Sequence, residues 1–261
     1  MSDLDPVLIA ALTDLVTGLE SLGLRFCVIG ALIPQLLLDE QPRRLTNDAD
    51  AVVAIETLEE FERLKEQFTK FHFNPTRLPF RLRHDGGGVV DILPYSHAVA
   101  PDDTLRLGND ITFNVAGFGQ LFDSAVVVDT CGLAIPVAPI PLYVLLKLAA
   151  YKDRKAPKDL GSVLHCLRYY EEEAERRYGL EHDGQFVPFE FTTAFMLGQD
   201  AKPFTEDVLA RVAAEVLAEF SDVDSVGVDR AAREEGRLHV EPEHQEEIVA
   251  LFGWFQKGFG L

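Results

Sequence analysis

Apolar residues recur at helical spacing near the start of the chain. Over residues 6–22, leucines repeat every three or four positions, which is typical of an amphipathic helix with one buried face. Asp5 and Pro6 favour a helix start before this stretch, and Gly23 favours a helix end after it. The pattern predicts a helix whose role is core packing.

Two apolar runs of strand type follow this helix. Residues 25–29 (RFCVI) are predicted to form a strand, Gly30 permits a tight turn, and the apolar stretch 31–38 is compatible with a helix. Residues 51–55 (AVVAI) are rich in β-branched side chains and predict a buried strand. A capping-box pattern then predicts a helix from residue 57 to about residue 70.

A glycine-rich turn separates the next two runs. Residues 77–83 (RLPFRLR) and 89–94 (VVDILP) flank the turn at 84–88, and this arrangement predicts a β-hairpin. Three further short strands are predicted, at residues 111–115, 125–129 and 133–137. A proline-rich segment, residues 137–142, marks a boundary before a helix.

The second half of the chain has mainly helical periodicity. Helices are predicted at residues 157–177, 205–220 and 243–255. Residues 178–188 and the acidic stretch 221–237 are predicted to be loops. We therefore expect an α+β fold, in which a mixed β-sheet flanked by helices forms a catalytic domain over residues 1–138. A mainly helical C-terminal region would follow over residues 139–261.

Three carboxylates stand beside or within the strand-type runs. Asp48 and Asp50 lie two positions apart and would share one face of a strand. Asp91 lies inside the second hairpin run, where an unpaired charge is costly to bury, and the hairpin would carry it alongside the other two. Closely held carboxylates repel each other, and a divalent cation removes that cost. Because Mg²⁺ binds carboxylate and phosphate oxygens, the pattern predicts a magnesium site for phosphoryl transfer.

Two other features suit phosphate binding. Backbone N–H groups at the helix start after Gly30 would cradle a phosphate, although strand, glycine and helix also form an ordinary turn in many α/β proteins. Strand alternation would place Arg81 and Arg83 on one face, as a contact for phosphate or acceptor. The alternative for these arginines is an exposed position with no specific role.

Gly30, the segment from Arg44 to Asp50, and Asp91 together resemble the DNA polymerase β type nucleotidyltransferase superfamily. Within it, the chain is most similar to the minimal nucleotidyltransferases and the AbiEii-type toxin group. The resemblance extends to the predicted helix of Lys147, and it departs from the family where Ala31 replaces a serine after the glycine.

The resemblance implies a role for each residue of this site. Asp48, Asp50 and Asp91 would be catalytic and would bind Mg²⁺ or Mn²⁺, with Asp91 serving the acceptor hydroxyl. The NTP would be bound by five further residues: Gly30, Ala31, Arg44, Thr46 and Lys147. For Lys147 the alternative is a side chain that extends from an apolar helix to the surface.

The family resemblance implies transfer of NMP from an NTP to an acceptor hydroxyl on a tRNA end or a protein. The chain would then be the toxin of a toxin–antitoxin or phage-defence pair, with an antitoxin protein as its partner. Two alternatives stay open: a small-molecule nucleotidyltransferase of the aminoglycoside type, and an inactive nucleotide-binding or protein-interaction module.

The composition of the chain limits the classes of partner that we expect it to bind. The chain has 261 residues, 47% of them hydrophobic, which is enough for a substantial core. Its net charge of −19 argues against general DNA or RNA binding and suits a cationic acceptor or a basic protein. The longest apolar stretches are too short to span a bilayer, and the basic flank of a signal peptide is missing. Three scattered cysteines indicate neither disulfides nor zinc, so we expect a cytoplasmic protein.

Overall fold

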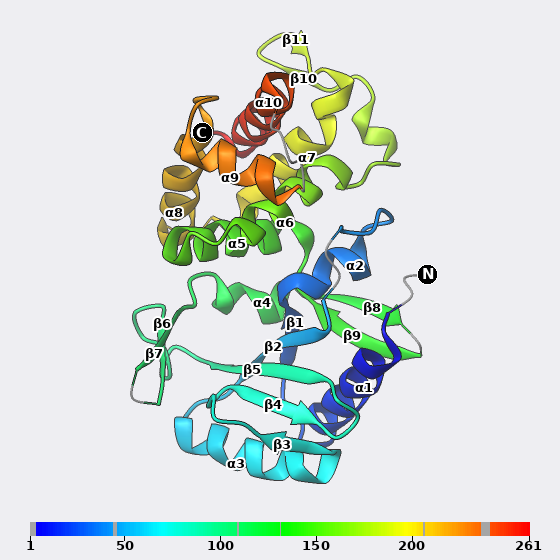
Figure 1. Ribbon diagram of the computed structural model, residues 1–261, viewed down its shortest axis with the longest axis vertical. Coiled ribbons are helices and arrows are strands. Elements are labelled where there is room, and N and C mark those ends of the chain that lie inside the picture. The colour runs from blue at the N-terminus through cyan, green and yellow to red at the C-terminus, as the bar shows by residue number, and fades with distance from the viewer. Residues whose placement is uncertain (1–3, 44–45, 109, 131, 206, 236–240) are drawn as a thin grey trace. The chain divides into compact units, whose positions relative to one another are not determined.

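A computed structural model describes residues 4–43, 46–108, 110–130, 132–205, 207–235 and 241–261 (Figure 1). The chain forms two compact units. The first consists of Met1–Leu37 and Arg44–Pro139, and the second of Leu38–Arg43 and Ile140–Leu261.

The first unit is built on a seven-stranded mixed sheet with the strand order β3-β4-β5-β2-β1-β9-β8. Pairs β2–β5 and β1–β9 are parallel, and the other neighbours are antiparallel. The strands are β1 (Phe26–Ile29), β2 (Asp48–Ala54), β3 (Phe73–Pro75), β4 (Arg81–His84), β5 (Val89–Tyr95), β8 (Val126–Thr130) and β9 (Leu133–Val137). A separate two-stranded sheet pairs β6 (Thr104–Leu107) with β7 (Ile111–Asn114).

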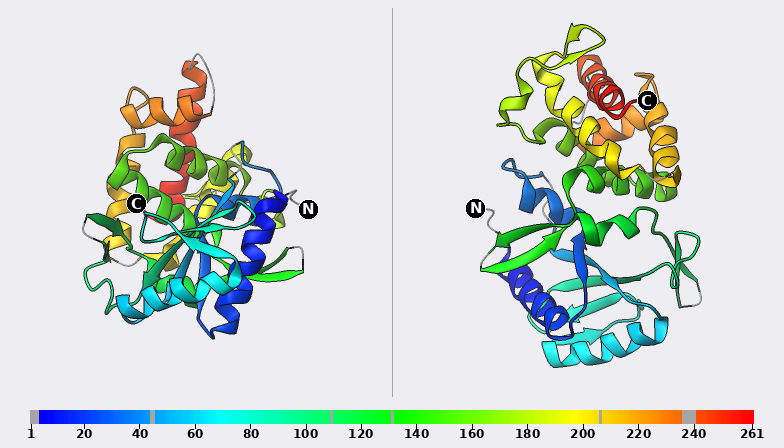
Figure 2. Two further views of the ribbon diagram at one scale, coloured as in Figure 1. Left: turned by 60° about the horizontal axis from the view of Figure 1, so that its bottom comes forward. Right: turned by 180° about the vertical axis from the view of Figure 1, so that it is seen from behind.

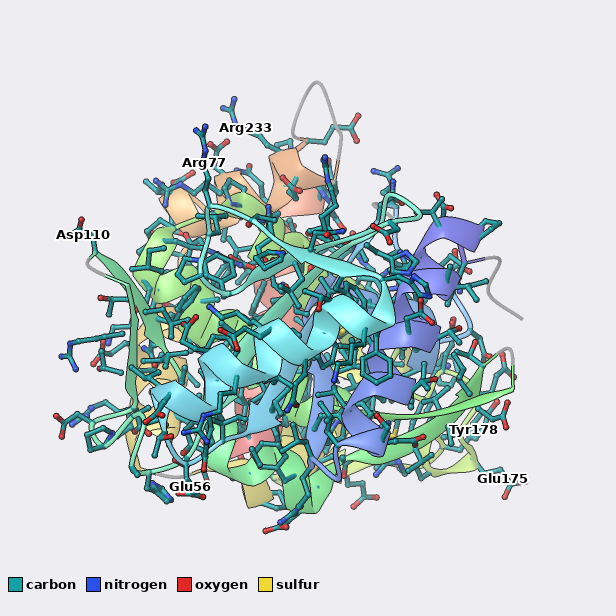
Figure 3. The ribbon with its side chains drawn as sticks, turned by 90° about the horizontal axis from the view of Figure 1, so that it is seen from below. Glu56, Arg77, Asp110, Glu175, Tyr178 and Arg233 are labelled. Carbon is teal, nitrogen blue, oxygen red and sulfur yellow. The ribbon has the colours of Figure 1, made fainter. Side chains whose placement is uncertain are left out.

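Helices α1 (Pro6–Ser21) and α3 (Leu58–Phe68) pack beside this sheet, as the views from different sides show (Figures 2 and 3). Asp5 caps α1 by accepting a hydrogen bond of 2.8 Å from the backbone N–H of Val7. The predicted capping box of α3 is present, with reciprocal hydrogen bonds between Thr57 and Glu60. The unit is completed by α2 (Ile33–Leu37) and α4 (Phe118–Ser124).

The second unit is mainly helical. Its helices are α5 (Ile140–Arg154), α6 (Pro157–Tyr169), α7 (Thr192–Ala201), α8 (Asp207–Leu217), α9 (Val226–Glu234) and α10 (Pro242–Phe259). A short hairpin pairs β10 (Glu181–His182) with β11 (Gln185–Phe186). Single 3₁₀ turns complete the two units at Gly30–Leu32, Thr69–Phe71, Glu175–Arg177, Phe189–Phe191, Lys202–Phe204 and Ala218–Phe220. The predicted α+β architecture, a mixed sheet flanked by helices and followed by a helical region, is confirmed.

The prediction of one long helix over residues 157–177 is wrong for residues 170–177. Helix α6 ends at Tyr169, and Glu171 adopts a left-handed φ of 46°. The chain turns here because Tyr170 donates a hydrogen bond of 2.7 Å to Asp200 of α7, and Arg176 pairs with the same carboxylate. These contacts hold residues 170–176 against α7, so the chain leaves the axis of α6.

The acidic stretch 221–237 was predicted to be a loop, and this is wrong for its centre. Residues 226–234 form α9, which Ser225 caps by accepting a hydrogen bond of 3.2 Å from Val228 N–H. Val228, Ala231 and Ala232 bury one face of this helix. The buried face of this helix is made of small residues, and many charged residues surround them in the sequence. Its amphipathic pattern is therefore too weak to predict a helix.

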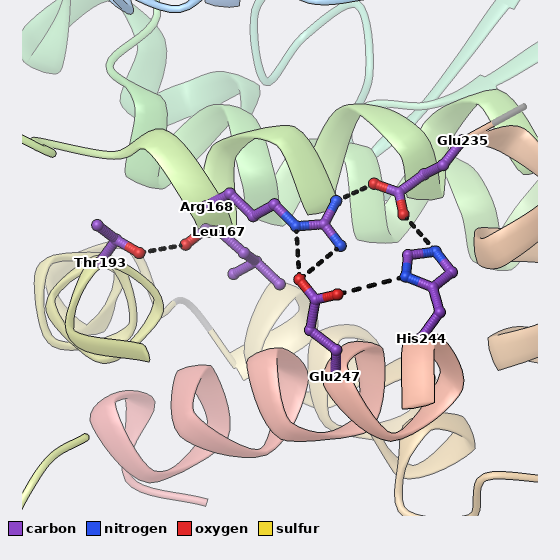
Figure 4. Close-up of polar contacts among 6 residues, drawn as sticks. All are labelled: Leu167, Arg168, Thr193, Glu235, His244 and Glu247. Carbon is purple, nitrogen blue, oxygen red and sulfur yellow. Dashed lines mark hydrogen bonds and ion pairs between the residues drawn. The ribbon is translucent and has the colours of Figure 1, made fainter. Parts of the chain in front are cut away.

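A partly buried charge network joins α6, α9 and α10 (Figure 4). Arg168 of α6 forms an ion pair with Glu235, which follows α9. It also contacts Glu247 of α10, with 3.1 Å between Arg168 Nη2 and Glu247 Oε1. His244 lies between the same two carboxylates, with its Nε2 2.7 Å from Glu235 and its Nδ1 3.3 Å from Glu247. Arg168 therefore compensates the charge of Glu235, which is mostly removed from water, and that of the half-exposed Glu247.

Replacing Arg168 by Met is expected to lower the free energy of unfolding by about 2 kcal/mol, because two partly buried carboxylates lose their cation. Urea unfolding followed by circular dichroism measures the change. Arg233→Met is the matched control, because Arg233 is exposed and its pair with Asp229 lies on the surface of α9 (Figure 3). That variant should change stability by less than about 0.5 kcal/mol; an equal loss in both variants would contradict the role given to Arg168.

No helix among the described residues is both long and apolar enough to cross a membrane.

Candidate active site

The three predicted carboxylates stand on two neighbouring strands of the first unit. Strands β2 and β5 run parallel in a register that pairs Asp50 directly with Asp91. Asp48 lies two residues before Asp50 on β2 and shares its face. Both aspartates belong to the strand itself, which starts at Asp48 and not after the pair as the sequence suggested. The structure therefore places Asp48, Asp50 and Asp91 on one face of the sheet.

Gly30 lies directly against the carboxylate of Asp50. It follows β1, whose last residue, Ile29, pairs with Asp50 in the antiparallel β1–β2 register. Gly30 has a left-handed φ of 81°, and a Cβ at this position would lie 1.9 Å from Asp50 Oδ2. Only glycine provides both the backbone conformation and the space for this close approach. The 3₁₀ turn that starts here contains Ala31, and α2 after it is only five residues long.

Replacing Gly30 by Ala is expected to destabilise the first unit by about 2 kcal/mol, because it combines a strained φ with a clash against Asp50. The matched control is Gly23→Ala, which has a similar φ of 67° but open space around the added Cβ. Urea unfolding of both variants separates the two causes, since Gly23→Ala carries the φ strain alone. Equal destabilisation would show that Asp50 moves aside freely.

Asp91 is held by an arginine from the neighbouring strand. Arg81 of β4 is the cross-strand partner of Asp91 and binds it bidentately, with Nε to Oδ1 and Nη2 to Oδ2 both at 2.7 Å. The Asp91 side chain is 13% exposed and that of Arg81 36%. The hydrogen bond with Asp91 raises the pKa of Arg81, and the negative charges of Asp48 and Asp50 add to the effect. Arg81 is thus a fixed positive charge among the three carboxylates.

The other predicted NTP-binding residues are placed differently. The hydroxyl of Thr46 hydrogen-bonds the Asp48 carboxylate. Arg44 lies outside the described residues. Lys147 belongs to α5 of the second unit, where its Nζ lies 3.3 Å from the fully buried Asp159 and over the ring of Tyr143. Its predicted phosphate contact stays a prediction.

The donor set suits a hard divalent cation. Mg²⁺ usually takes one or two protein carboxylates and completes its shell with water and phosphate oxygens, and Asp48 and Asp50 supply such a pair. Within the part of the chain that the structure describes, no three acidic, histidine or cysteine side chains converge as a metal-binding group. Asp91, the third expected ligand, is paired with Arg81 instead.

An open groove of about 510 Å³ adjoins this arginine. Its lining combines cationic side chains with apolar ones: Asn74, Pro75, Thr76, Arg77, Leu78, Arg81, Arg83 and Val89. Arg83 lies two residues after Arg81 on β4, on the same face, as the sequence alternation predicted. Arg77 is exposed at the periphery of the unit (Figure 3).

The contact between Arg81 and Asp91 was missed from the sequence, although a signal for it exists. The β4–β5 hairpin pairs Leu82 with Val90 and Arg83 with Val89, so the pairs are symmetric about Gly86. Counting outward from that glycine brings Arg81 opposite Asp91. The register of a hairpin depends on its turn type. Three successive glycines at 86–88 are compatible with several turn types, so the sequence did not define this register.

No protein-family model matches the chain. No curated protein matches it either. Among solved structures, the chain is similar to the crystal structure of an antigenic nucleotidyltransferase-like protein from Paracoccidioides brasiliensis, with 17% sequence identity and a TM-score of 0.42. The match covers 62% of this chain and 76% of that one. A similarity at this TM-score does not establish a function, which has to come from the site itself.

Proposed function

We propose that this chain is a magnesium-dependent nucleotidyltransferase, which moves NMP from an NTP to an acceptor hydroxyl and releases pyrophosphate. The observation that supports the proposal is the position of Asp48, Asp50 and Asp91 on one face of two neighbouring parallel strands. The glycine backbone that packs against Asp50 adds to this support.

Each of these residues has a part in the proposed reaction. Asp48 and Asp50 would hold the Mg²⁺, or Mn²⁺, and through it the triphosphate. When bound, the ion offsets the negative charge that develops on the phosphate oxygens. Gly30 would let the triphosphate approach the backbone closely. Asp91, held in place by Arg81, would orient the acceptor hydroxyl toward the α-phosphorus.

For the acceptor we propose a tRNA end or a protein side chain, with the chain acting as a toxin in a toxin–antitoxin or phage-defence pair. The support is the motif from Arg44 to Asp50, which resembles that of the AbiEii-type group. A neutralising antitoxin would then be the protein partner.

Two other functions each have one observation in their favour. A net charge of −19 favours a cationic small-molecule acceptor such as an aminoglycoside. The capture of both Asp91 oxygens by Arg81 favours an inactive nucleotide-binding module.

The deciding experiment measures pyrophosphate release from each of the four NTPs with Mg²⁺ and a total tRNA pool, an aminoglycoside panel or a protein lysate as acceptor. Asp48→Ala/Asp50→Ala is the control variant. We expect release that requires both aspartates and labels tRNA or protein. Release with an aminoglycoside alone would replace the acceptor assignment, and nucleotide binding without release under any condition would favour the inactive module.

A further inference from the structure

The arginine-lined groove of about 510 Å³ lies on the same face of the sheet as the three carboxylates. Residues that pair directly across neighbouring strands project from one face. The strand register gives two such rows of residues: Asn74, Arg83, Val89 and Asp48 in one, and Arg81, Asp91 and Asp50 in the other. The groove lining draws on both rows, so the groove continues the candidate site toward the sheet edge at β3.

Helices α1 and α3 cover the opposite face of this part of the sheet. Phe73 of β3 pairs with His84 of β4, and both alternate with the row of Arg83. The ring centroid of Phe73 lies 5.5 Å from that of Phe68 on α3. His84 Nε2 lies 2.9 Å from the carboxylate of Asp14 on α1. Arg83 therefore projects from the face that these two helices leave open, and its side chain is exposed.

The segment that forms the groove is basic, although the chain is acidic. Residues 67–84 contain three arginines, one lysine and no Asp or Glu, whereas the whole chain has 43 acidic and 24 basic residues. Arg81 is paired with Asp91. Arg77 and Arg83 are exposed, and neither has an acidic partner within the described part of the chain. Two guanidinium groups are thus available to a ligand in one groove.

The lining suits the backbone of a single-stranded nucleic acid. Guanidinium groups match phosphate oxygens in charge and in hydrogen-bond geometry. An open cationic groove that also offers apolar surface is typical of sites that follow such a strand. Leu78, which is 38% exposed, provides apolar surface for a ribose or a base. The net charge of −19 repels a polyanion from the rest of the chain, so the contact would be confined to the groove.

We propose that Arg77 and Arg83 bind the phosphate groups of a single-stranded nucleic acid, which lies in this groove with its end beside Asp91. Binding of the strand does not depend on catalysis, but its use as the acceptor rests on the proposed function. The inference then selects a nucleic-acid end among the acceptors and makes Arg77 and Arg83 residues that determine acceptor specificity.

Fluorescence anisotropy of a labelled single-stranded RNA of about ten nucleotides tests the proposal. The full chain is titrated into the RNA in EDTA and without NTP, so that neither metal ions nor turnover contribute. We expect a dissociation constant of about 10 µM at about 50 mM salt. Each phosphate contact on a single strand contributes about −0.7 to the slope of log K against log salt, so two contacts predict about −1.4.

Single substitutions in the groove separate phosphate contacts from other effects. Arg77→Gln and Arg83→Gln should each weaken binding about tenfold and bring the slope to about −0.7. Arg83→Lys retains the charge and should retain the slope. The matched control is Arg63→Gln, which removes an exposed arginine of the same unit from α3, on the opposite face, and should leave the affinity within twofold. Circular dichroism checks that each variant is folded.

The alternative source of phosphate is the NTP itself, so ATP is titrated against the same variants. ATP binding that requires Arg77 and Arg83, with no RNA binding, would assign the groove to the triphosphate and overturn the proposal. A wild type that does not bind RNA would overturn it too, as would an unchanged salt slope in Arg77→Gln/Arg83→Gln or an equal loss in Arg63→Gln. Arginine-dependent RNA binding without pyrophosphate release from any NTP would leave the groove assignment standing and refute the nucleotidyltransferase function alone.

Discussion

The proposed nucleotidyl transfer is expected to fall about a thousandfold when Asp50 is replaced by Asn. The substitution keeps the shape of the side chain and its packing against Gly30, but removes the charge that would hold the metal ion. Metal ions supply several kcal/mol of transition-state stabilisation, and a loss of about 4 kcal/mol corresponds to about three orders of magnitude in rate. Steady-state pyrophosphate release at saturating NTP measures the effect.

Asp123→Asn is the matched control for this change. Asp123 lies in α4 of the same unit, with a side chain that is 84% exposed, and its partner is the exposed Arg25. The same chemical change there should leave the rate within twofold of wild type, because the charge is far more screened. Retention of more than a tenth of the activity by Asp50→Asn would remove this residue from the proposed metal site.

Asp159→Asn is expected to lower the free energy of unfolding of the second unit by about 3 kcal/mol. The Asp159 side chain is fully buried and accepts hydrogen bonds from Arg154, at 2.7 Å from Nε, and from Lys147, at 3.3 Å. Its substitution leaves two cations without their common carboxylate, and breaking a buried pair in this way is costly. Urea unfolding at pH 7 measures the loss. Asp153→Asn, an exposed position on α5, should cost less than about 0.5 kcal/mol.

The contribution of Asp159 to the free energy of unfolding is expected to decrease at low pH. Burial alone would raise the pKa of this carboxyl, but the hydrogen bond from Arg154 and the charge of Lys147 outweigh it and hold the pKa below its ordinary value. A carboxyl with a lowered folded-state pKa stabilises the fold above its unfolded pKa of about 3.9 and loses that effect as pH falls further. The stability difference between wild type and Asp159→Asn should therefore be constant from pH 7 to 5 and shrink below about pH 4. A constant difference down to pH 2 would contradict the assignment.

The structure also gives Lys147 a partner that its sequence motif did not suggest. The family resemblance predicts that this lysine binds the NTP, because it lies on a helix that follows the sheet. Asp159 lies twelve positions later in the chain, on α6, so its pairing with Lys147 depends on how α5 and α6 pack together. Spacing along one helix carries no information about such a contact between two helices.

Local patterns were sufficient where a structure depends on neighbouring residues. The capping box at Thr57 and Glu60 and the hairpin around Gly86 follow from short-range rules, and both are present. The helix end at Tyr169 was not predictable in this way, because it depends on the contact of Tyr170 with Asp200, thirty residues away. Strand alternation was enough to put Asp48 and Asp50 on one face, whereas the position of Asp91 beside Asp50 depends on the parallel pairing of β2 with β5, which lie far apart in the sequence.

Residues 38–43 limit how this protein can be divided. They group with the second unit, although the first unit flanks them on both sides in the sequence, and the carbonyl of Glu40 lies 3.0 Å from His165 Nε2 of α6. A gene fragment that encodes residues 140–261 therefore lacks one piece of the unit it is meant to produce. Dissection at a single junction, or transplantation of the helical part to another protein, has to carry this hexapeptide along as a separate insertion.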